Sequence, residues 1–128
     1  MAQKFVQTYG NPNVVTLTTG HAGDYAGSTA TAGVTGDTNG SDMVVSVAAT
    51  TSTSENSLRV YVKPAAGSTT YLFSLPIPAR TVVFPSVPWS SPIFTEDHPF
   101  RLASGAGLLY ELEKTESAIN VTEIKLSY

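Results

Sequence analysis

The feature that most constrains this chain is a two-residue alternation of apolar and polar side chains that recurs in short runs. In the segment 57–63 (SLRVYVK), Leu58, Val60 and Val62 alternate with polar or amphipathic neighbours. This period places the three apolar side chains on one face of a half-buried strand. No segment keeps a helical period over three turns. The pattern therefore predicts an all-β protein.

Turn residues separate the apolar runs. Pro, Gly, Ala and Ser cluster at 64–68, and Ser, Gly and Ala at 104–107. Strands are expected at 13–19, 43–49, 57–63, 69–75, 108–114 and 118–127, with a weaker one at 29–35. The run 57–75 is typical of a β-hairpin. Since 128 residues suffice for one domain, we expect a single antiparallel β-sandwich, or a jelly-roll-like one.

Prolines gather in residues 76–99, which hold six of the eight in the chain. Proline lacks a backbone donor, so this stretch cannot form a helix or a central strand. A short edge strand over Arg80–Phe84 remains compatible with the prolines on either side.

The last expected strand contains a break in its alternation. Ile119 and Val121 share one face, whereas Ile124 and Leu126 fall on the opposite face. Either both faces are covered there, or a β-bulge near Thr122 and Glu123 resets the alternation. The bulge is the favoured interpretation.

The N-terminal third differs in composition from the rest. Residues 1–42 hold seven of the ten glycines, and few side chains in 20–42 are large enough to fill a core. We therefore divide the chain into an extended Gly/Thr-rich N-terminal arm and loop, 1–42, with one or two strands, and a β-sandwich body, 43–128. A long segment without structure of its own usually has a task, so the arm is expected to order on a neighbouring subunit.

Charge and composition exclude several classes of function. Charged residues make up 13% of the chain, against about 25% in ordinary soluble proteins, and 14 Ser and 17 Thr take their place. The seven basic residues are scattered, so no nucleic-acid partner is expected. No cysteine is present, and no apolar run approaches the roughly 20 residues of a membrane span. Without a signal-peptide pattern, synthesis in a cytoplasm is the expectation.

The one acid–base cluster is Glu96-Asp97-His98. It could hold a metal or supply a catalytic pair, but neighbours along a strand point to opposite faces and converge poorly on one ion. A solvated loop is the favoured interpretation. The chain also lacks G-x-S-x-G and G-x-G-x-x-G motifs. No catalytic, metal-binding or cofactor-binding residue is therefore predicted, and the chain is not expected to be an enzyme.

The single tryptophan, Trp89, stands in a proline-stiffened segment, PSVPWSSP. An aromatic ring there could stack on a sugar or anchor an interface. It could also plug the end of a sandwich core, which is the favoured interpretation. The sugar interpretation keeps a carbohydrate-binding β-sandwich module open as an alternative function, although the tyrosines have no spacing that identifies a sugar platform.

Several segments follow each other in a recognisable order. They are Asn39-Gly40-Ser41, the strand 58–62 (LRVYV), the run 72–79 (LFSLPIPA), Phe100-Arg101-Leu102 and the final Tyr128. This succession, which covers about 90 residues, resembles small β-sandwich virion proteins of tailed bacteriophages. The chain departs from their usual pattern at Gly107-Leu108, where they have Gly-Tyr. It departs again at the end of the chain, where they have Gly-Asp-Tyr.

The resemblance implies a capsid decoration (cement) protein that stabilises the phage head by bridging major capsid subunits. It would lie on the capsid surface of the virion, as a homo-oligomer and by analogy a trimer. A neck, tail or baseplate accessory protein is the nearest alternative. The residues expected to contact the shell or a neighbouring subunit are Phe5, Tyr9, Val14, Val15 and Leu17 in the arm, and Trp89 and Phe94 in the proline-rich loop.

Overall fold

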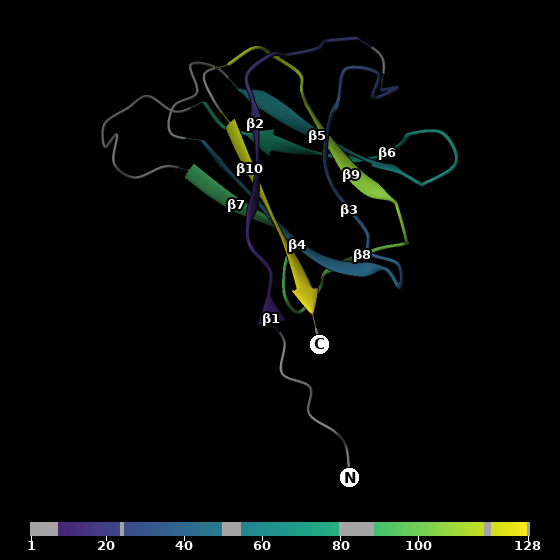
Figure 1. Ribbon diagram of the computed structural model, residues 1–128. Helices are drawn as coiled ribbons and strands as arrows, with labels where there is room; N and C mark the ends of the chain where they lie inside the picture. The colour runs from purple at the N-terminus through teal and green to yellow at the C-terminus, as the bar shows by residue number, and fades with distance from the viewer. Residues whose placement is uncertain (1–7, 24, 50–54, 80–88, 117–118, 128) are drawn as a thin grey trace.

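The computed structural model describes residues 8–23, 25–49, 55–79, 89–116 and 119–127. They form two antiparallel sheets that pack face to face as a sandwich, which confirms the predicted fold class (Figure 1). None of these residues belongs to a helix able to cross a membrane. The strands are β1 (Thr8–Tyr9), β2 (Asn13–Leu17), β3 (Thr31–Thr35), β4 (Ser41–Ala49), β5 (Asn56–Lys63), β6 (Thr70–Ile77), β7 (Trp89–Phe94), β8 (Phe100–Leu102), β9 (Gly107–Leu112) and β10 (Ile119–Ser127).

The connectivity resembles that of a jelly roll. Sheet one has the order β2–β10–β4–β7, with β1 pairing farther along β10 and β8 farther along β4. Sheet two has the order β3–β9–β5–β6. From β2 onward the chain passes from one sheet to the other at each connection, except within the β5–β6 hairpin and between β7 and β8. With β1 and β8 set aside, each sheet has four strands side by side, and this order is jelly-roll-like.

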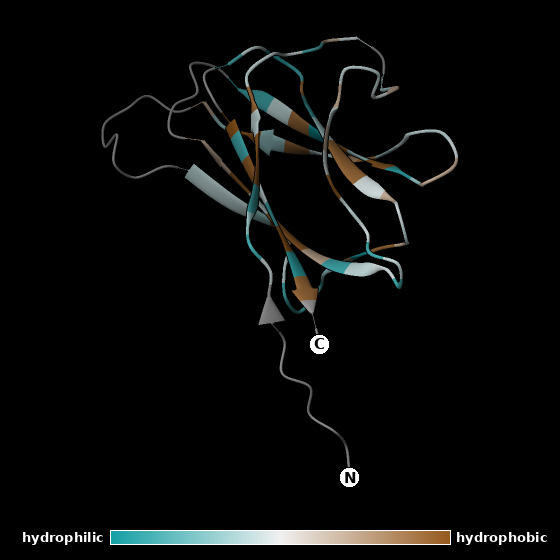
Figure 2. Cartoon of the chain, viewed as in Figure 1, coloured by the Kyte–Doolittle hydropathy of each residue, from teal (hydrophilic) through white to brown (hydrophobic). Residues whose placement is uncertain are grey.

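The core lies between the sheets. Met43, Val45 and Val47 of β4 face inward, as the alternation predicts, and are at most 1% exposed. They meet Leu58 of β5 and Leu112 of β9 in one hydrophobic cluster. Each such side chain contributes about 1.5–3 kcal/mol when it leaves water. Bands of hydrophobic and hydrophilic residues alternate along β5 and β10, as the colours in Figure 2 show.

The N-terminal third does not form a separate arm over its described length. β2 pairs with β10 along its whole length, and Val15 and Leu17 are only 6% and 5% exposed. β3 is an edge strand of sheet two. The division at residue 42 therefore corresponds to no boundary in the fold. The strand over 13–19 and the weaker one over 29–35 are both present, and their inward side chains complete the sandwich.

The glycines of this third permit close packing instead of marking a free segment. The described residues of the loop 18–30, namely 18–23 and 25–30, lie beside sheet two, where the His21 amide donates a hydrogen bond of 2.8 Å to the Leu112 carbonyl. Gly27 is buried and has a φ of 74°, a conformation open to glycine without strain. A Cβ on Gly27 would lie 2.8 Å from the Thr69 methyl group and 3.2 Å from the Tyr61 ring. A larger residue would hold the loop away from the sheet.

The predicted bulge in β10 is wrong. The register between β10 and β4 runs without a shift from Ile119–Ala49 to Leu126–Asp42. The alternation breaks because a charged residue, Glu123, takes an inward position and is 1% exposed. Leu126, on the opposite face, is also buried. Both faces of β10 are therefore covered at Leu126, whereas Asn120, on the same outer face, is exposed.

Proline determines which strands lie at the edges. β6 contains Pro76 and β7 contains Pro92, and these two strands are the outer strands of sheet two and sheet one. Proline has no backbone N–H to donate, and at an edge this does not leave a hydrogen bond missing inside the sheet. The exclusion of a central strand from 76–99 is therefore confirmed for the described part of that stretch. The strand expected at Arg80–Phe84 lies outside the described residues.

Candidate functional site

The outer face of sheet one is uncharged across its central rows. Its side chains are those that alternate with the core positions along four adjacent strands. Its central rows are Val14 and Thr16 of β2, Asn120, Thr122 and Ile124 of β10, Val44, Ser46 and Ala48 of β4, and Ser90 and Pro92 of β7. The row at one end of the face holds the buried Leu126 and the charged Asp42. The residues of the central rows are small or medium in size and carry no charge, and four of them bear hydroxyl groups.

Register places these residues in rows across the face. Thr122 stands between Val14 and Ser46, and Asn120 stands between Thr16 and Ala48. Thr16 donates a hydrogen bond of 2.9 Å to the side-chain oxygen of Asn120. Val14 is 55% exposed, the highest exposure among the large hydrophobic side chains described. Covering a surface of this kind with another protein costs little desolvation free energy, because no charge has to leave water.

The outer face of sheet two differs, because it carries polar side chains that the loop 18–30 covers. Arg59, Tyr61 and Glu111 project there and are 0–3% exposed. Arg59 lies 3.1 Å from Glu111, and the Tyr61 hydroxyl donates a bond of 2.7 Å to the same oxygen. Arg59 also donates to the His21 carbonyl at 2.8 Å. Thr29 donates to the other carboxylate oxygen of Glu111.

These contacts fix the protonation states of the cluster. Burial by itself raises the pKa of Glu111, but the hydrogen bonds from Thr29, Tyr61 and Arg59 outweigh it, so the pKa is lowered. Burial and the bond to Glu111 raise the pKa of Tyr61 to about 12. The cluster is thus a satisfied ion pair that holds the loop on the sheet. The sequence gives no sign that this face is covered.

A second buried carboxylate, Glu123, joins the two sheets. It accepts a bond of 2.8 Å from the Val34 amide and one of 3.2 Å from the Asn13 side chain. The Tyr110 hydroxyl donates to its other oxygen, and burial together with this carboxylate raises the pKa of Tyr110 well above its usual range. A Cβ on Gly33 would lie 2.0 Å from the Glu123 carboxylate. The broken alternation in 118–127 was the sequence signal of this group.

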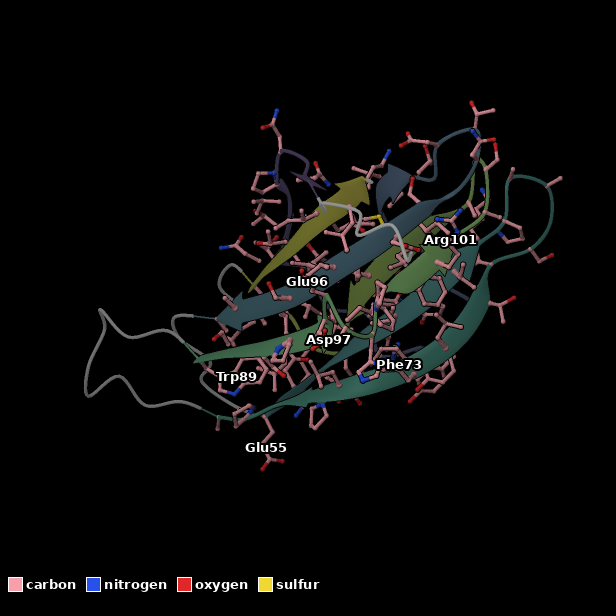
Figure 3. All side chains as sticks on the ribbon, turned by 90° about the horizontal axis from the view of Figure 1, so that it is seen from below. Glu55, Phe73, Trp89, Glu96, Asp97 and Arg101 are labelled. Carbon is pink, nitrogen blue, oxygen red and sulfur yellow. The ribbon has the colours of Figure 1, made fainter. Side chains whose placement is uncertain are left out.

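A cleft of about 480 Å³ opens at one end of the sandwich. It is formed by the start of β5, the end of β6, the start of β7 and the residues after β9. Its lining combines apolar rings with charged and amide side chains, namely Glu55, Asn56, Ser57, Pro76, Ile77, Pro78, Trp89, Glu113 and Lys114. Figure 3 shows Trp89 and Glu55 at this end and Arg101 at the opposite one.

Trp89 lies between the core and the surface of the cleft. Its half-buried ring packs against the hydrophobic core and also lines the cleft. The cleft floor is held in place by Asn56, which donates to the Lys114 carbonyl and accepts from the Lys114 amide, each at 2.9 Å. Glu113 donates its backbone amide to the Ser57 carbonyl at 3.0 Å. These bonds join the start of β5 to the residues after β9, next to Trp89 in the lining of the cleft.

The Glu96-Asp97-His98 segment forms an exposed turn between β7 and β8. Backbone bonds of 3.1 and 3.3 Å link His98 and Thr95 and close this turn. Over the described part of the chain, no three His, Cys, Asp or Glu side chains are grouped so as to hold a metal ion.

The seven residues expected at an interface do not form one patch. Phe5 lies outside the described residues, and Tyr9 pairs with Leu126 through β1. Val14 is exposed, whereas Val15 and Leu17 belong to the core. Their burial corrects the expectation that both contact a shell, because a strand paired with β10 turns alternate residues inward. Phe94 is half-buried, with its ring centroid 5.0 Å from Phe100 and 5.9 Å from Phe73, and closes the opposite edge.

Sequence reasoning missed one exposed aromatic pair. Tyr25 of the loop 18–30 and Tyr71 of β6 are 53% and 38% exposed, with ring centroids 4.9 Å apart. The guanidinium of Arg59 lies 4.2 Å from the Tyr25 centroid. Forty-five positions separate the two tyrosines, so no local spacing could reveal the pair.

Comparisons with family models, curated proteins and solved structures find no match to this chain.

Proposed function

We propose that this chain is a bacteriophage virion structural protein, most directly a capsid decoration (cement) protein that bridges major capsid subunits and so stabilises the head. The observation that carries the proposal is the uncharged outer face of sheet one, with Val14 exposed at its edge. A decoration protein needs an extended contact surface more than a chemical centre.

The distribution of charge supports this function. The buried carboxylates Glu111 and Glu123 are bound within the fold by hydrogen bonds. At the rim of the outer face, Asp42 pairs with Arg101 at 3.3 Å. The face between these groups presents hydroxyl, amide and aliphatic side chains, which can pack against a protein surface without an unpaired charge.

The edge of the face offers a second mode of contact. β2 is an outer strand of sheet one, and it pairs with β10 on one side only among the described strands. Backbone groups on a free edge can pair with a strand from a neighbouring subunit. Ordering such a strand costs about 1–2 kcal/mol per residue in backbone entropy, which side-chain contacts on the adjoining face help to offset.

The jelly-roll-like fold is compatible with this role. Jelly rolls occur in viral capsid proteins and in lectins, so the fold by itself does not select a function. The ordered run of turn and strand segments that resembles phage virion proteins favours the first of these classes.

The first experiment measures where the protein is. Quantitative mass spectrometry of purified virions from the phage that encodes this chain should give a copy number comparable to that of the major capsid protein. A few to a few dozen copies would favour the neck, tail or baseplate alternative. Absence from the particle would overturn the proposal. Light scattering of the purified protein tests the expected trimer.

A matched pair of variants tests the face. Ser46→Arg adds a charge to the centre of the outer face of sheet one, whereas Thr70→Arg adds the same charge to an exposed position on β6. Binding to capsids that lack the protein, measured by co-sedimentation, should fall about tenfold or more for Ser46→Arg and stay unchanged for Thr70→Arg. Equal binding by both would show that the shell contact lies elsewhere.

A further inference from the structure

We propose that the cleft beside Trp89 binds a carbohydrate, with one sugar ring of a neutral or amine-bearing glycan stacked on the indole. This site is separate from the outer face of sheet one, and the proposal does not rest on the decoration function.

The lining of the cleft has the two components that a sugar requires. A pyranose presents apolar C–H groups on its ring faces and hydroxyl groups around its edge. Trp89, Pro76 and Pro78 supply flat or apolar walls, and an aromatic ring with one buried side can stack on such a face. The volume of about 480 Å³ is within the range of small-ligand sites, about 300–1,000 Å³.

Charged side chains around the cleft select the type of sugar. Glu55 and Lys114 are exposed and Glu113 is half-buried, and all three line the cleft. Carboxylates accept hydrogen bonds from sugar hydroxyls, and the lysine amine donates them. Two carboxylates against one ammonium give the lining a negative balance, which disfavours acidic sugars and sulfated or phosphorylated ligands.

The floor of the cleft is already in a fixed arrangement. Asn56 is 4% exposed, and its amide is occupied by the two bonds to Lys114 and by the Ser57 amide at 2.8 Å. Ile77 is 1% exposed and belongs to the core. A ligand therefore meets a floor whose polar groups are already paired, and a preformed surface lowers the entropy loss on binding.

The tryptophan is also the reporter for the test, because the chain has only one. The purified full-length protein is titrated with neutral oligosaccharides built from glucose, galactose or N-acetylglucosamine, and with a sialylated oligosaccharide. At least one neutral glycan should change Trp89 fluorescence saturably, and the sialylated one should bind at least about tenfold more weakly. Saturable binding of the acidic glycan alone, or no response to any glycan, overturns the proposal.

Variants place the binding in the cleft. Glu113→Gln should weaken the responding glycan about threefold to tenfold, whereas Tyr71→Ala, which removes an exposed aromatic ring elsewhere, should leave the affinity unchanged. In the wild-type protein, glycan addition should shift the NMR amide signals of Asn56 and Lys114. Shifts confined to Tyr25 and Tyr71, or a loss of binding in Tyr71→Ala, would overturn the assignment to this cleft. None of these tests depends on removing Trp89, which also packs in the core.

Discussion

Replacing Glu123 by alanine tests whether the buried carboxylate holds the two sheets together. Glu123 is 1% exposed and accepts bonds from Val34, Asn13 and Tyr110. Truncation leaves the Val34 amide and the Tyr110 hydroxyl without their acceptor. A buried donor that loses its partner costs about 1–3 kcal/mol, so two such donors give about 2–6 kcal/mol. We expect Glu123→Ala to lower the free energy of unfolding by about 4 kcal/mol, a large part of the roughly 5–15 kcal/mol of a typical domain.

Urea denaturation, followed by Trp89 fluorescence and by circular dichroism, measures this loss. Glu123→Gln keeps the shape of the side chain and one acceptor oxygen, so it should lose less, about 1–3 kcal/mol. Tyr110→Phe should lose about 1–2 kcal/mol, and the double variant should lose less than the sum of the two. Glu55→Ala, at an exposed position, is the control. A loss below about 1 kcal/mol for Glu123→Ala would refute the reasoning.

Three further predictions concern Glu111, Tyr61 and the glycine beside Glu123, Gly33. Folding depresses the pKa of Glu111 below its ordinary 4.5, so the stabilisation from this carboxylate is present above that pH and is lost as the pH falls through the folded-state pKa. In urea denaturation from pH 7 to 3, the free energy of unfolding should decline less for Glu111→Gln than for the wild-type protein. Equal declines would contradict this reasoning. Folding raises the pKa of Tyr61 from 10.0 to about 12, so the stabilisation from its hydroxyl is full below pH 10 and is lost as the pH rises through about 12. In melts followed by circular dichroism, the melting temperature of Tyr61→Phe should fall less over this pH range than that of the wild-type protein. An unchanged profile would exclude Tyr61 as the source of the loss. Gly33→Ala would set a Cβ 2.0 Å from the Glu123 carboxylate and should cost about 2 kcal/mol or more; Gly23→Ala, whose Cβ meets only the movable ring of His21, should cost less than about 1 kcal/mol, and equal costs would show that the carboxylate yields.

The strands that sequence alone predicts best are those with one core face and one solvent face. In β4 the run Met43, Val45, Val47 determines both the element and its orientation, and all three side chains are buried. The hairpin β5–β6 follows from the turn at 64–68 between two such runs. Proline then indicates which strands lie at the edges. Local pattern is sufficient wherever a residue's burial depends on its own strand and the sheet behind it.

The N-terminal third shows where composition misleads. A segment rich in Gly, Ala, Ser and Thr has little to bury, which favoured an arm. Gly27 packs so closely on Tyr61 and Thr69 that small size is what allows the loop to lie on the sheet. The contacts that hold it join Thr29 to Glu111 and His21 to Arg59, across separations that no local window contains.

Of the candidate surfaces, sequence identified single residues but not their grouping. Trp89 was singled out, and the cleft that it lines depends on Asn56 and Lys114 meeting at the far end of the sheet. The uncharged outer face of sheet one depends on register. Val14, Thr122, Ser46 and Pro92 become one row only once β2, β10, β4 and β7 are neighbours in that order.

The two outer faces of the sandwich differ in a way that bears on assembly. Sheet two carries charged groups on its outer face, and the fold covers them with the loop 18–30 and pairs them internally. Sheet one carries uncharged groups on the central rows of its outer face, with the Asp42–Arg101 pair at the rim, and the described residues place no comparable loop over those rows. Of the two faces, only that of sheet one can be covered by another protein without removing a loop or isolating a charge. If a shell or a second copy contacts this protein through a sheet face, the physical chemistry of burial therefore selects sheet one, and Ser46, at the centre of that face, is the position where a single added charge is most disruptive.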